Sequence, residues 1–505
     1  LEEFGQYLEI PIINGLSDFG HPCQIMSDIL TYEESNGSIS GKTISWIGDG
    51  NNNMSNSLIE AAAKFDFNLK IGCPKKYEPG KKILSWAKKN KVNLTITKKP
   101  EDAVKDSDCV MTDKWVSMND KVNKKAKKKI LKPYQVNKKL LKIAKSDAIF
   151  MHCLPVGRGE EVTDEVIDGK PDSFVITGDI DAMWLRDSTA QVWPYMPLIN
   201  RDSKIKNLIL GLINRQVKCV LTDPYANAFF KDLTRISKWS TDIPKPKPGV
   251  HERKWEIDSL CYFIRLSYHY YKISGDKSFM DSDWDKAARL VVGTFRAEQR
   301  ENGTSPYSFS REHSMTVGLA QFYGKGAPTK YTGLIHSIFR PSDDGTLLPY
   351  LIPSNIFAYV SLAQLSELYS IGNKDFDFSK ECISFSTQVK SAVEKYAIKE
   401  HQDFGEIYAY EIDGFGNALF MDDANVPSLM SLAYIGGHSA KDPIYKNTRK
   451  FLVSESNPWF LRGKAAEGQS SPHTGRENIW PMGIILRGIT SEDEKEIIMC
   501  LKMLK

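Results

Sequence analysis

The feature that most constrains the fold of this chain is a change of hydrophobic pattern near residue 169. Before this point, helical stretches alternate with short apolar runs at residues 42–47, 68–72, 93–97, 109–112 and 149–152. Such an alternation indicates a parallel sheet covered on both faces. After residue 187, apolar residues recur at three- and four-residue steps, as on amphipathic helices. We therefore expect a multidomain protein, with a Rossmann-like α/β half-domain at residues 1–169 and an all-α domain at 170–505.

Length and composition narrow the class of protein. A chain of 505 residues is too long for one ordinary core, and 41% hydrophobic and 26% charged residues are typical of globular proteins. We see no apolar run near the roughly 18 residues of a membrane span, so no membrane partner is expected. The eight cysteines are scattered without a Cys-x-x-Cys pair, which favours a reduced setting, and we expect a cytoplasmic protein.

A lysine-rich stretch at residues 121–142 raises the question of nucleic-acid binding. It carries ten lysines in 22 residues, and such a run can neutralise backbone phosphates. However, it has no arginine, and Tyr134 is its one aromatic residue, whereas single-strand binders interleave stacking rings. The net charge of +4 is also small for the chain length. We therefore expect small-molecule ligands rather than a nucleic acid.

Polar clusters follow three of the expected strands, at residues 48–52, 113–118 and 152–155. In parallel sheets, ligands bind outside the carboxyl ends of the strands, which favours a functional interpretation of these clusters. Together with residues 11–18 (Pro-Ile-Ile-Asn-Gly-Leu-Ser-Asp) and 21–24 (His-Pro-Cys-Gln), they make five motifs. In this order the motifs resemble ornithine carbamoyltransferase over about residues 1–168. The resemblance implies the ornithine-binding domain of that family.

The same resemblance implies a set of binding residues. The amino acid would be held by Asn14, Asp113, Ser117 and Met118, with Cys153 and Leu154 beside the reacting centre and His21 and Gln24 near carbamoyl phosphate. These residue types suit the chemistry, because an acid pairs with an ammonium group and amide or hydroxyl donors pair with a carboxylate. A lone buried cysteine is more often a small core residue, but the His-Cys-Leu-Pro context favours a site for Cys153.

The α/β part also departs from the family pattern. Asn119 stands where the family has the glycine of Ser-Met-Gly, which disturbs a backbone position suited to glycine. The half that carries the Ser-Thr-Arg-Thr phosphate loop is not found in the sequence, so we do not expect carbamoyl transfer by this chain alone. Because the family forms trimers, an oligomer through this part is an open alternative.

The pattern after residue 187 predicts a ring of paired helices. Apolar residues at helical spacing predict helices at residues 187–199, 203–218, 256–274, 281–299, 354–370, 378–399, 425–436, 445–455, 476–487 and 490–503. Few strand signals are present, and the polar chemistry falls on the connecting loops. Paired helices with functional loops favour an (α/α)6 toroid over a bundle with a filled axis.

The loops of this part gather acids beside aromatic residues, at residues 178–187, 251–258, 339–344 and 421–427. A sugar site needs these types, because carboxylates bind hydroxyls and move protons while ring faces cover the pyranose. A calcium site is a weaker alternative, since Asp179 and Asp181 lack the spacing of a calcium-binding loop. Acids at helix N-termini can also simply cap exposed amides, but four such clusters favour the sugar site.

Seven motifs then resemble glycoside hydrolase family 125, the metal-independent exo-α-1,6-mannosidases that act with inversion on an (α/α)6 toroid. They lie at residues 174–188, 223–228, 252–259, 339–344, 352–355, 422–428 and 471–474. The resemblance implies a general acid at Asp343 or Asp344, and we expect burial and the neighbouring acid to raise its pKa. It implies a mannoside site formed by Asp181, Arg186, Asp187, Glu252, Asp422, Asp423 and His473, with no metal and no cofactor.

Inversion also requires a catalytic base across the sugar from the acid. In the family, this base lies in a His-Glu-Ser stretch after the segment that matches residues 490–505. We therefore expect the toroid to be incomplete in this sequence and turnover by it alone to be weak. Glycoside hydrolysis by an inverting exo-α-1,6-mannosidase with an appended carbamoyltransferase-like domain is the leading hypothesis. The alternatives are a carbamoyltransferase-related amino-acid-binding protein and a chimeric gene product without activity.

Overall fold

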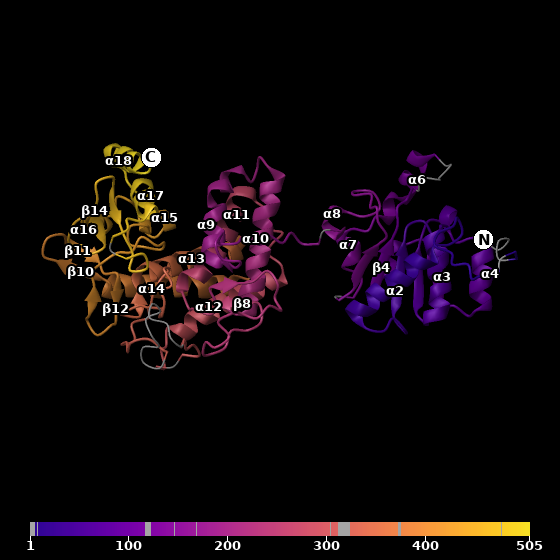
Figure 1. Ribbon diagram of the computed structural model, residues 1–505, viewed down its shortest axis with the longest axis horizontal. Coiled ribbons are helices and arrows are strands. Elements are labelled where there is room, and N and C mark those ends of the chain that lie inside the picture. Colours follow the sequence, from indigo (N-terminus) through magenta and orange to yellow (C-terminus); the bar gives the residue numbers. More distant parts are fainter. Residues whose placement is uncertain are drawn as a thin grey trace. The chain divides into compact units, whose positions relative to one another are not determined.

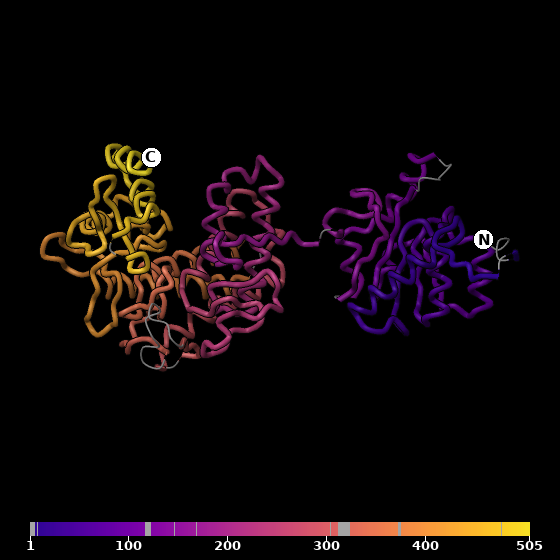
Figure 2. The backbone as a smooth tube through the Cα atoms, viewed as in Figure 1, coloured from indigo at the N-terminus to yellow at the C-terminus, as the bar shows by residue number. Residues whose placement is uncertain are grey.

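The computed structural model describes residues 6–7, 9–116, 123–145, 147–167, 169–303, 305–311, 324–371, 375–475 and 477–505. The chain forms two compact units, Leu1–Lys170 and Pro171–Lys505 (Figure 1). We call the first the α/β unit and the second the helical unit, and each is described by itself. Figure 2 traces the backbone of each unit through the sequence.

The α/β unit is built on one parallel sheet of five strands in the order β3-β2-β1-β4-β5. The strands are β1 (Thr43–Ile47), β2 (Asn68–Gly72), β3 (Leu94–Thr97), β4 (Cys109–Thr112) and β5 (Ile149–His152). The helices between and around them are α2 (Pro22–Asn36), α3 (Asn53–Phe65), α4 (Lys81–Lys89), α5 (Pro100–Val104), α6 (Lys124–Leu131), α7 (Lys138–Leu141) and α8 (Asp164–Ile167). The parallel sheet predicted from the alternating pattern is confirmed.

Alternate residues of the central strands face two separate cores. Trp46 of β1 and Met111 of β4 pack in a core with apolar side chains of α2, α3 and α4. Their neighbours Ile47 and Val110 pack in a second core with side chains of α5 and α7. Because successive side chains of a strand point to opposite faces, both faces of the sheet are covered.

The described residues of the helical unit contain ten α-helices. They are α9 (Leu185–Val192), α10 (Ser203–Thr222), α11 (Ile257–Ser274), α12 (Ser282–Glu298), α13 (Ile352–Ile371), α14 (Phe376–Tyr396), α15 (Leu432–Ile435), α16 (Pro443–Leu452), α17 (Pro481–Ile489) and α18 (Glu494–Met503). The pairs α13–α14, α11–α13, α10–α12 and α17–α18 pack against each other. The helical character is therefore confirmed, while the closed toroid stays a prediction.

Short strands hold the loops of the helical unit. The sheet β6-β7-β8 joins Met183–Trp184, Ala228–Phe229 and Val250–Glu252, and the sheet β13-β12-β9 joins Ala418–Leu419, Glu411–Ile412 and Tyr350–Leu351. Two antiparallel pairs complete the strands described in this unit, β10 (Ile398–His401) with β11 (Gly405–Tyr408) and β14 (Phe460–Arg462) with β15 (Glu467–Gln469). The sheet β6-β7-β8 fixes the start of α9 and the loop before α11. The start of α9 and this loop carry residues of the site described below.

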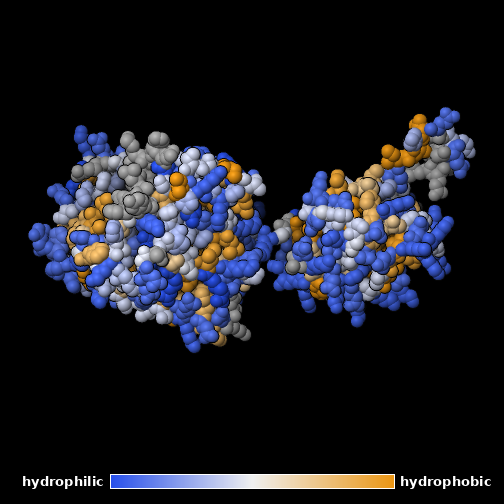
Figure 3. Space-filling model, turned by 90° about the horizontal axis from the view of Figure 1, so that it is seen from below, coloured by the Kyte–Doolittle hydropathy of each residue, from blue (hydrophilic) through white to orange (hydrophobic). Residues whose placement is uncertain are grey.

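The helix predicted at residues 425–436 is wrong for most of its length, because α15 covers Leu432–Ile435 alone. The buried carboxylate of Asp422 accepts the backbone N–H groups of Leu429 and Met430, at 2.8 and 3.0 Å. These bonds replace helical ones, so the apolar residues here follow a loop. Elsewhere the helices turn apolar sides to one large core, and hydrophilic side chains predominate on the face of this unit in Figure 3.

Candidate active site

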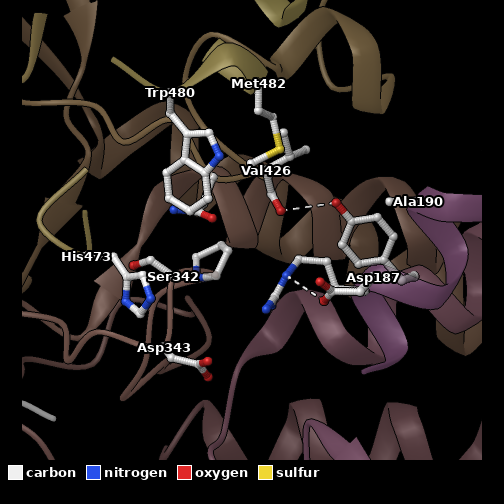
Figure 4. A pocket seen from close by; sticks show the side chains of 12 residues that line it. Asp187, Ala190, Ser342, Asp343, Val426, His473, Trp480 and Met482 are labelled. Atoms are coloured by element: carbon white, nitrogen blue, oxygen red, sulfur yellow. Dashed lines mark hydrogen bonds and ion pairs between the residues drawn. The ribbon is translucent and has the colours of Figure 1, made fainter. Parts of the chain in front are cut away.

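A cavity of about 240 Å³ opens in the helical unit (Figure 4). Drug-sized ligand sites enclose roughly 300–1,000 Å³, so this cavity suits a small ligand. It is lined by Arg186, Asp187, Ala190, Tyr262, Pro341, Ser342, Asp343, Asn425, Val426, His473, Trp480 and Met482. Four residues predicted from the sequence, Arg186, Asp187, Asp343 and His473, thus lie around one cavity.

Arg186, in the first turn of α9, is held among three acids. Its Nη1 lies 2.7 Å from Glu256 Oε2 and 3.1 Å from Asp258 Oδ2, and its Nε lies 3.5 Å from Asp187 Oδ2. Burial alone would lower the pKa of Arg186, but the charges of Glu256, Asp187 and Asp258 raise it. The guanidinium therefore forms a permanent cation in the cavity wall, beside a second cavity carboxylate at Asp187.

Asp343 lies in the turn of the Arg-Pro-Ser-Asp-Asp motif. Its φ of 68° is in the left-handed region, which is unfavourable for a residue other than glycine. Backbone bonds hold the turn: Asp343 N–H donates to Arg340 O at 2.9 Å, and Arg340 N–H donates to Asp344 O at 2.8 Å. The turn directs a carboxylate that is 24% exposed into the cavity (Figure 4).

The surroundings of Asp343 favour its charged form. Asn227 Nδ2 donates to Asp343 Oδ1 at 2.9 Å, and Lys254 Nζ lies 3.5 Å from the same oxygen. Burial acts to raise the pKa of Asp343, but Lys254 and Arg186 outweigh it, and the pKa lies below its ordinary value. The raised pKa expected for Asp343 is therefore wrong, because the motif sequence does not show the lysine that the loop after β8 brings to it.

Asp344 is not among the residues that line the cavity, but it pairs with His473, which is. Ser342 Oγ donates to Asp344 Oδ2 at 3.0 Å, and His473 Nδ1 lies 3.8 Å from Asp344 Oδ1. Interaction with Asp344 raises the pKa of His473. The His473 ring stacks on Trp480, with ring centroids 6.5 Å apart and planes at 22°. The two rings thus form an aromatic wall of the cavity.

Two predicted mannoside ligands lie away from the cavity lining. Asp181 is 74% exposed and pairs with Arg235, at 2.6 Å between Oδ2 and Nη1. Glu252 is buried, with Oε1 2.9 Å from Arg311 Nη1 and Oε2 3.4 Å from Lys254 Nζ. Their contact with a sugar stays a prediction.

Asp422 and Asp423 are wholly buried and hold the loop that follows them. Asp422 accepts the two backbone N–H groups described above and the side chain of Gln469, and burial raises its pKa to about 7. Asp423 Oδ1 accepts both the backbone N–H and the side chain of Asn425, at 2.9 and 2.8 Å. Asn425 lines the cavity, so in this structure Asp423 reaches the site through Asn425.

The sequence prediction missed four residues of this site, namely Asn227, Lys254, Glu256 and Trp480. Three of them lie inside the motifs at residues 223–228 and 252–259, so their place in these motifs could have identified them as site residues. Trp480 lies just beyond the motif at 471–474, and its proximity depends on the turn that leads into α17.

The α/β unit brings a second group of predicted residues together at the carboxyl ends of β4 and β5. Cys153 Sγ donates to Asp113 Oδ1 at 3.1 Å, and burial raises the pKa of both groups. His152 is buried, with Nε2 3.2 Å from Glu161 Oε1 and Nδ1 against the Cys153 carbonyl oxygen. Asp113, His152 and Cys153 bring possible metal ligand atoms within 4.8 Å of one another, but both His152 nitrogens already have partners.

The other predicted residues of the α/β unit are more dispersed. Gln24 Nε2 donates to Asp28 Oδ1 at 2.9 Å, and Asn14 Nδ2 donates to Ser17 Oγ at 3.2 Å. His21 N–H donates to Ser57 Oγ at 2.9 Å, and Leu154 is 76% exposed. Ser117 and Met118 lie outside the described residues.

Among the helices of the described ranges, none has the length and apolar character that crossing a membrane requires.

Two family models match this chain, and they overlap at residues 144–178. The family model of the metal-independent alpha-mannosidases (GH125) matches residues 144–505. The model of the Asp/Orn binding domain of aspartate/ornithine carbamoyltransferase matches residues 40–178. The chain is 37% identical over 378 residues to the meiotically up-regulated gene 157 protein of Schizosaccharomyces pombe, over 71% of this chain and 74% of the relative.

Two further relatives each match a part of the chain. A metal-independent alpha-mannosidase of Streptococcus pneumoniae, solved in a non-productive complex with α-1,6-mannobiose, has 37% identity and a TM-score of 0.63, over 67% of this chain and 82% of that one. Ornithine carbamoyltransferase of Mesorhizobium japonicum is 52% identical over 175 residues, which is 35% of this chain and 57% of the enzyme. The chain thus spans little more than half the length of this carbamoyltransferase. By its mannosidase match, it belongs to the metal-independent alpha-mannosidase family GH125 and carries in addition a domain of the ornithine carbamoyltransferase type.

Proposed function

We propose that the helical unit is an inverting exo-α-1,6-mannosidase on an (α/α)6 toroid, with Asp343 as its general acid. The observation that carries this proposal is the position of Asp343, which is a cavity carboxylate held by Asn227 and Lys254 in a left-handed turn. The solved relative from Streptococcus pneumoniae holds α-1,6-mannobiose, which supports this disaccharide as substrate. Asp344 faces His473 and is the second candidate for the acid.

The remaining cavity residues would bind the sugar. Asp187 Oδ2 has the 3.5 Å ion pair with Arg186 Nε but no hydrogen bond within the described residues, and it would accept a mannose hydroxyl. Arg186, fixed by its acids, would donate to the ring substituents on the same side. Trp480 and His473 would cover the apolar face of a pyranose. The matching family consists of metal-independent alpha-mannosidases, which supports a site without a metal.

Hydrolysis of α-1,6-mannobiose tests the proposal, with the anomer of the released mannose followed by NMR. We expect β-mannose as first product, because inversion turns the α-linkage over. Asp343→Asn should lower kcat by about 10²–10⁴-fold, the usual contribution of a general acid, with Asp344→Asn as the matched comparison. Release of α-mannose, or no cleavage by the wild-type protein, would refute the proposal, and full activity in Asp343→Asn would move the acid to Asp344.

For the α/β unit we propose binding of an α-amino acid with a side-chain amine, such as ornithine. The supporting observation is the Asp113–Cys153 contact at the carboxyl ends of neighbouring strands, where parallel sheets bind ligands. Thermal unfolding with ornithine should show a rise in transition temperature that Asp113→Asn abolishes. Mannose should not shift this transition, and an equal response of wild type and variant to ornithine would contradict the site.

A further inference from the structure

Two carboxyl groups of the mannosidase site are joined through one amide. Asn227 Nδ2 donates to Asp343 Oδ1 at 2.9 Å and to Glu256 Oε1 at 3.2 Å. Glu256 directly precedes α11, is completely buried, and also accepts from Ser259 Oγ at 3.0 Å. Asp343 is partly exposed to the cavity. The two carboxyls are therefore an inner and an outer member of one pair.

The charges around the pair differ between its members. Facing Glu256 are Arg186 of α9 and Asp258 of α11, and facing Asp343 are Arg186, Lys254 and His473. Burial, the charges of Asp343 and Asp258, and a hydrogen bond to Asp343 raise the pKa of Glu256 far above its ordinary value, against the pull of Arg186. Lys254, Arg186 and the same hydrogen bond lower the pKa of Asp343 in spite of its burial. The two carboxyls share the Asn227 amide, and their surroundings favour the proton on Glu256 rather than on Asp343.

This distribution conflicts with the role of Asp343 unless the proton can move. A general acid must carry its proton when the glycosidic bond breaks. We propose that Glu256 is a positioning residue that stores this proton and passes it to Asp343 when a mannoside fills the cavity. The inference rests on the proposed function of Asp343. It adds a group that touches no reacting atom and acts through the acid.

Each proton given up in the proposed transfer is replaced from the site or its water. A bound sugar excludes water from the exposed part of Asp343, which disfavours its charge, and the proton moves from the Glu256 carboxyl to the Asp343 carboxylate. As the bond between C1 and the glycosidic oxygen breaks, Asp343 gives this proton to the oxygen, which leaves as a hydroxyl of the second mannose. The attacking water adds its oxygen to C1 and releases one proton, which returns to Glu256 through solvent. The Glu256 carboxylate is meanwhile paired with Arg186.

The kinetic test compares two leaving groups in Glu256→Gln. Glutamine keeps the shape but donates an N–H to Asp343, which stabilises its carboxylate and blocks its reloading. With α-1,6-mannobiose, whose leaving group needs a proton, we expect kcat/KM to fall at least about 100-fold and the basic limb of the pH profile to move to lower pH. With 2,4-dinitrophenyl α-mannoside, whose leaving group departs as an anion, the fall should be below about threefold. Equal losses on both substrates would assign Glu256 a purely structural role and overturn the inference.

Glu298→Gln is the matched control. Glu298 is also completely buried and accepts from an arginine, a serine and a third side chain, namely Arg300, Ser305 and Tyr225. None of these hydrogen-bond partners lines the cavity or interacts with Asp343. The control variant should lose stability by a similar amount without any leaving-group dependence.

An infrared measurement decides the inference without turnover. The wild-type protein at neutral pH should show a carbonyl band of a protonated carboxyl group that is missing in Glu256→Gln and present in Glu298→Gln. Binding of a non-hydrolysed mannoside analogue should shift this band, because the proton then lies on Asp343. Wild-type protein that cleaves no mannoside would refute the proposed function and leave this band as the deciding observation. Identical spectra for wild type and Glu256→Gln would overturn the inference even in an active enzyme.

Discussion

Removing the carboxylate of Glu411 tests how the acid turn is held. Glu411 of β12 is completely buried, and its Oε1 lies 2.6 Å from Arg340 Nε. Its Oε2 accepts the backbone N–H groups of Leu347 and Leu348, at 2.9 and 3.0 Å. Arg340 begins the turn that carries Asp343. Glu411→Ala therefore leaves one buried cation and two backbone donors without their acceptor.

The expected loss follows from these contacts. Breaking a buried ion pair costs about 3–5 kcal/mol because the remaining charge is left uncompensated. Each unsatisfied buried donor adds about 1–3 kcal/mol when water cannot reach it, although such terms do not add fully. We expect Glu411→Ala to lower the free energy of unfolding by about 5 kcal/mol. Glu411→Gln keeps an acceptor oxygen and loses the charge, so about 2 kcal/mol is expected from the weaker hydrogen bonds.

Thermal unfolding followed by tryptophan fluorescence measures this difference. At about 2.1 cal/mol/K of unfolding entropy per residue, one kcal/mol shifts the transition of the unit Pro171–Lys505 by roughly 1.4 °C, so the alanine variant should unfold about 7 °C lower. Glu400→Ala, an exposed glutamate of β10, is the control and should stay within about 0.5 kcal/mol of wild type. A loss below about 1 kcal/mol in Glu411→Ala would refute the argument, because it would mean that the Arg340 charge is solvated without Glu411.

Three further outcomes are expected. Burial and nearby cations lower the pKa of His251 to about 4, below its ordinary 6.5. The neutral histidine therefore stabilises the fold fully above pH 6.5, and this stabilisation is lost as pH falls toward 4. In urea denaturation, His251→Phe should remove up to about 3 kcal/mol of the difference in unfolding free energy between pH 8 and pH 4. Trp480→Ala should raise KM for α-1,6-mannobiose about tenfold with a smaller change in kcat, and an unchanged KM would exclude sugar stacking. Prolonged dialysis against EDTA should leave hydrolysis unchanged, and a loss restored by a divalent cation would contradict a metal-independent site.

The parallel sheet was predictable because its information is local. Strands β2, β4 and β5 begin and end at the predicted residues, because all their positions are buried or half-buried in a sheet covered on both faces. The α-helices of the helical unit were predictable for a similar reason, as with α11 and α12, whose bounds lie within one residue of the prediction. Residues 425–431 were not, because Asp422 binds their backbone from a buried position that no periodicity records.

The site was predictable in its residue types and less so in its charges. Arg186 and Asp343 belong to motifs that carry paired acids, and they line one cavity. The protonation of Asp343 depends on Asn227, which is 116 positions away, and on Lys254, which the short sheet β6-β7-β8 places. Such pairings follow from tertiary structure, so a sequence motif alone gave the wrong direction for the pKa of Asp343.

The buried charges behind Asp343 form a chain of alternating sign. Asp242 pairs with Arg311 at 2.7 Å, Arg311 with Glu252 at 2.9 Å, Glu252 with Lys254 at 3.4 Å, and Lys254 with Asp343 at 3.5 Å. Apolar residues of equal volume would stabilise the fold at least as well, so stability does not account for this arrangement. Its effect is electrostatic: each charge compensates the next, and the last link reaches the cavity already oriented. If Asp242 were neutralised, Arg311 would pair more strongly with Glu252, and Lys254 would then pair more strongly with Asp343. A residue without cavity contact thus still influences the charge of the proposed acid.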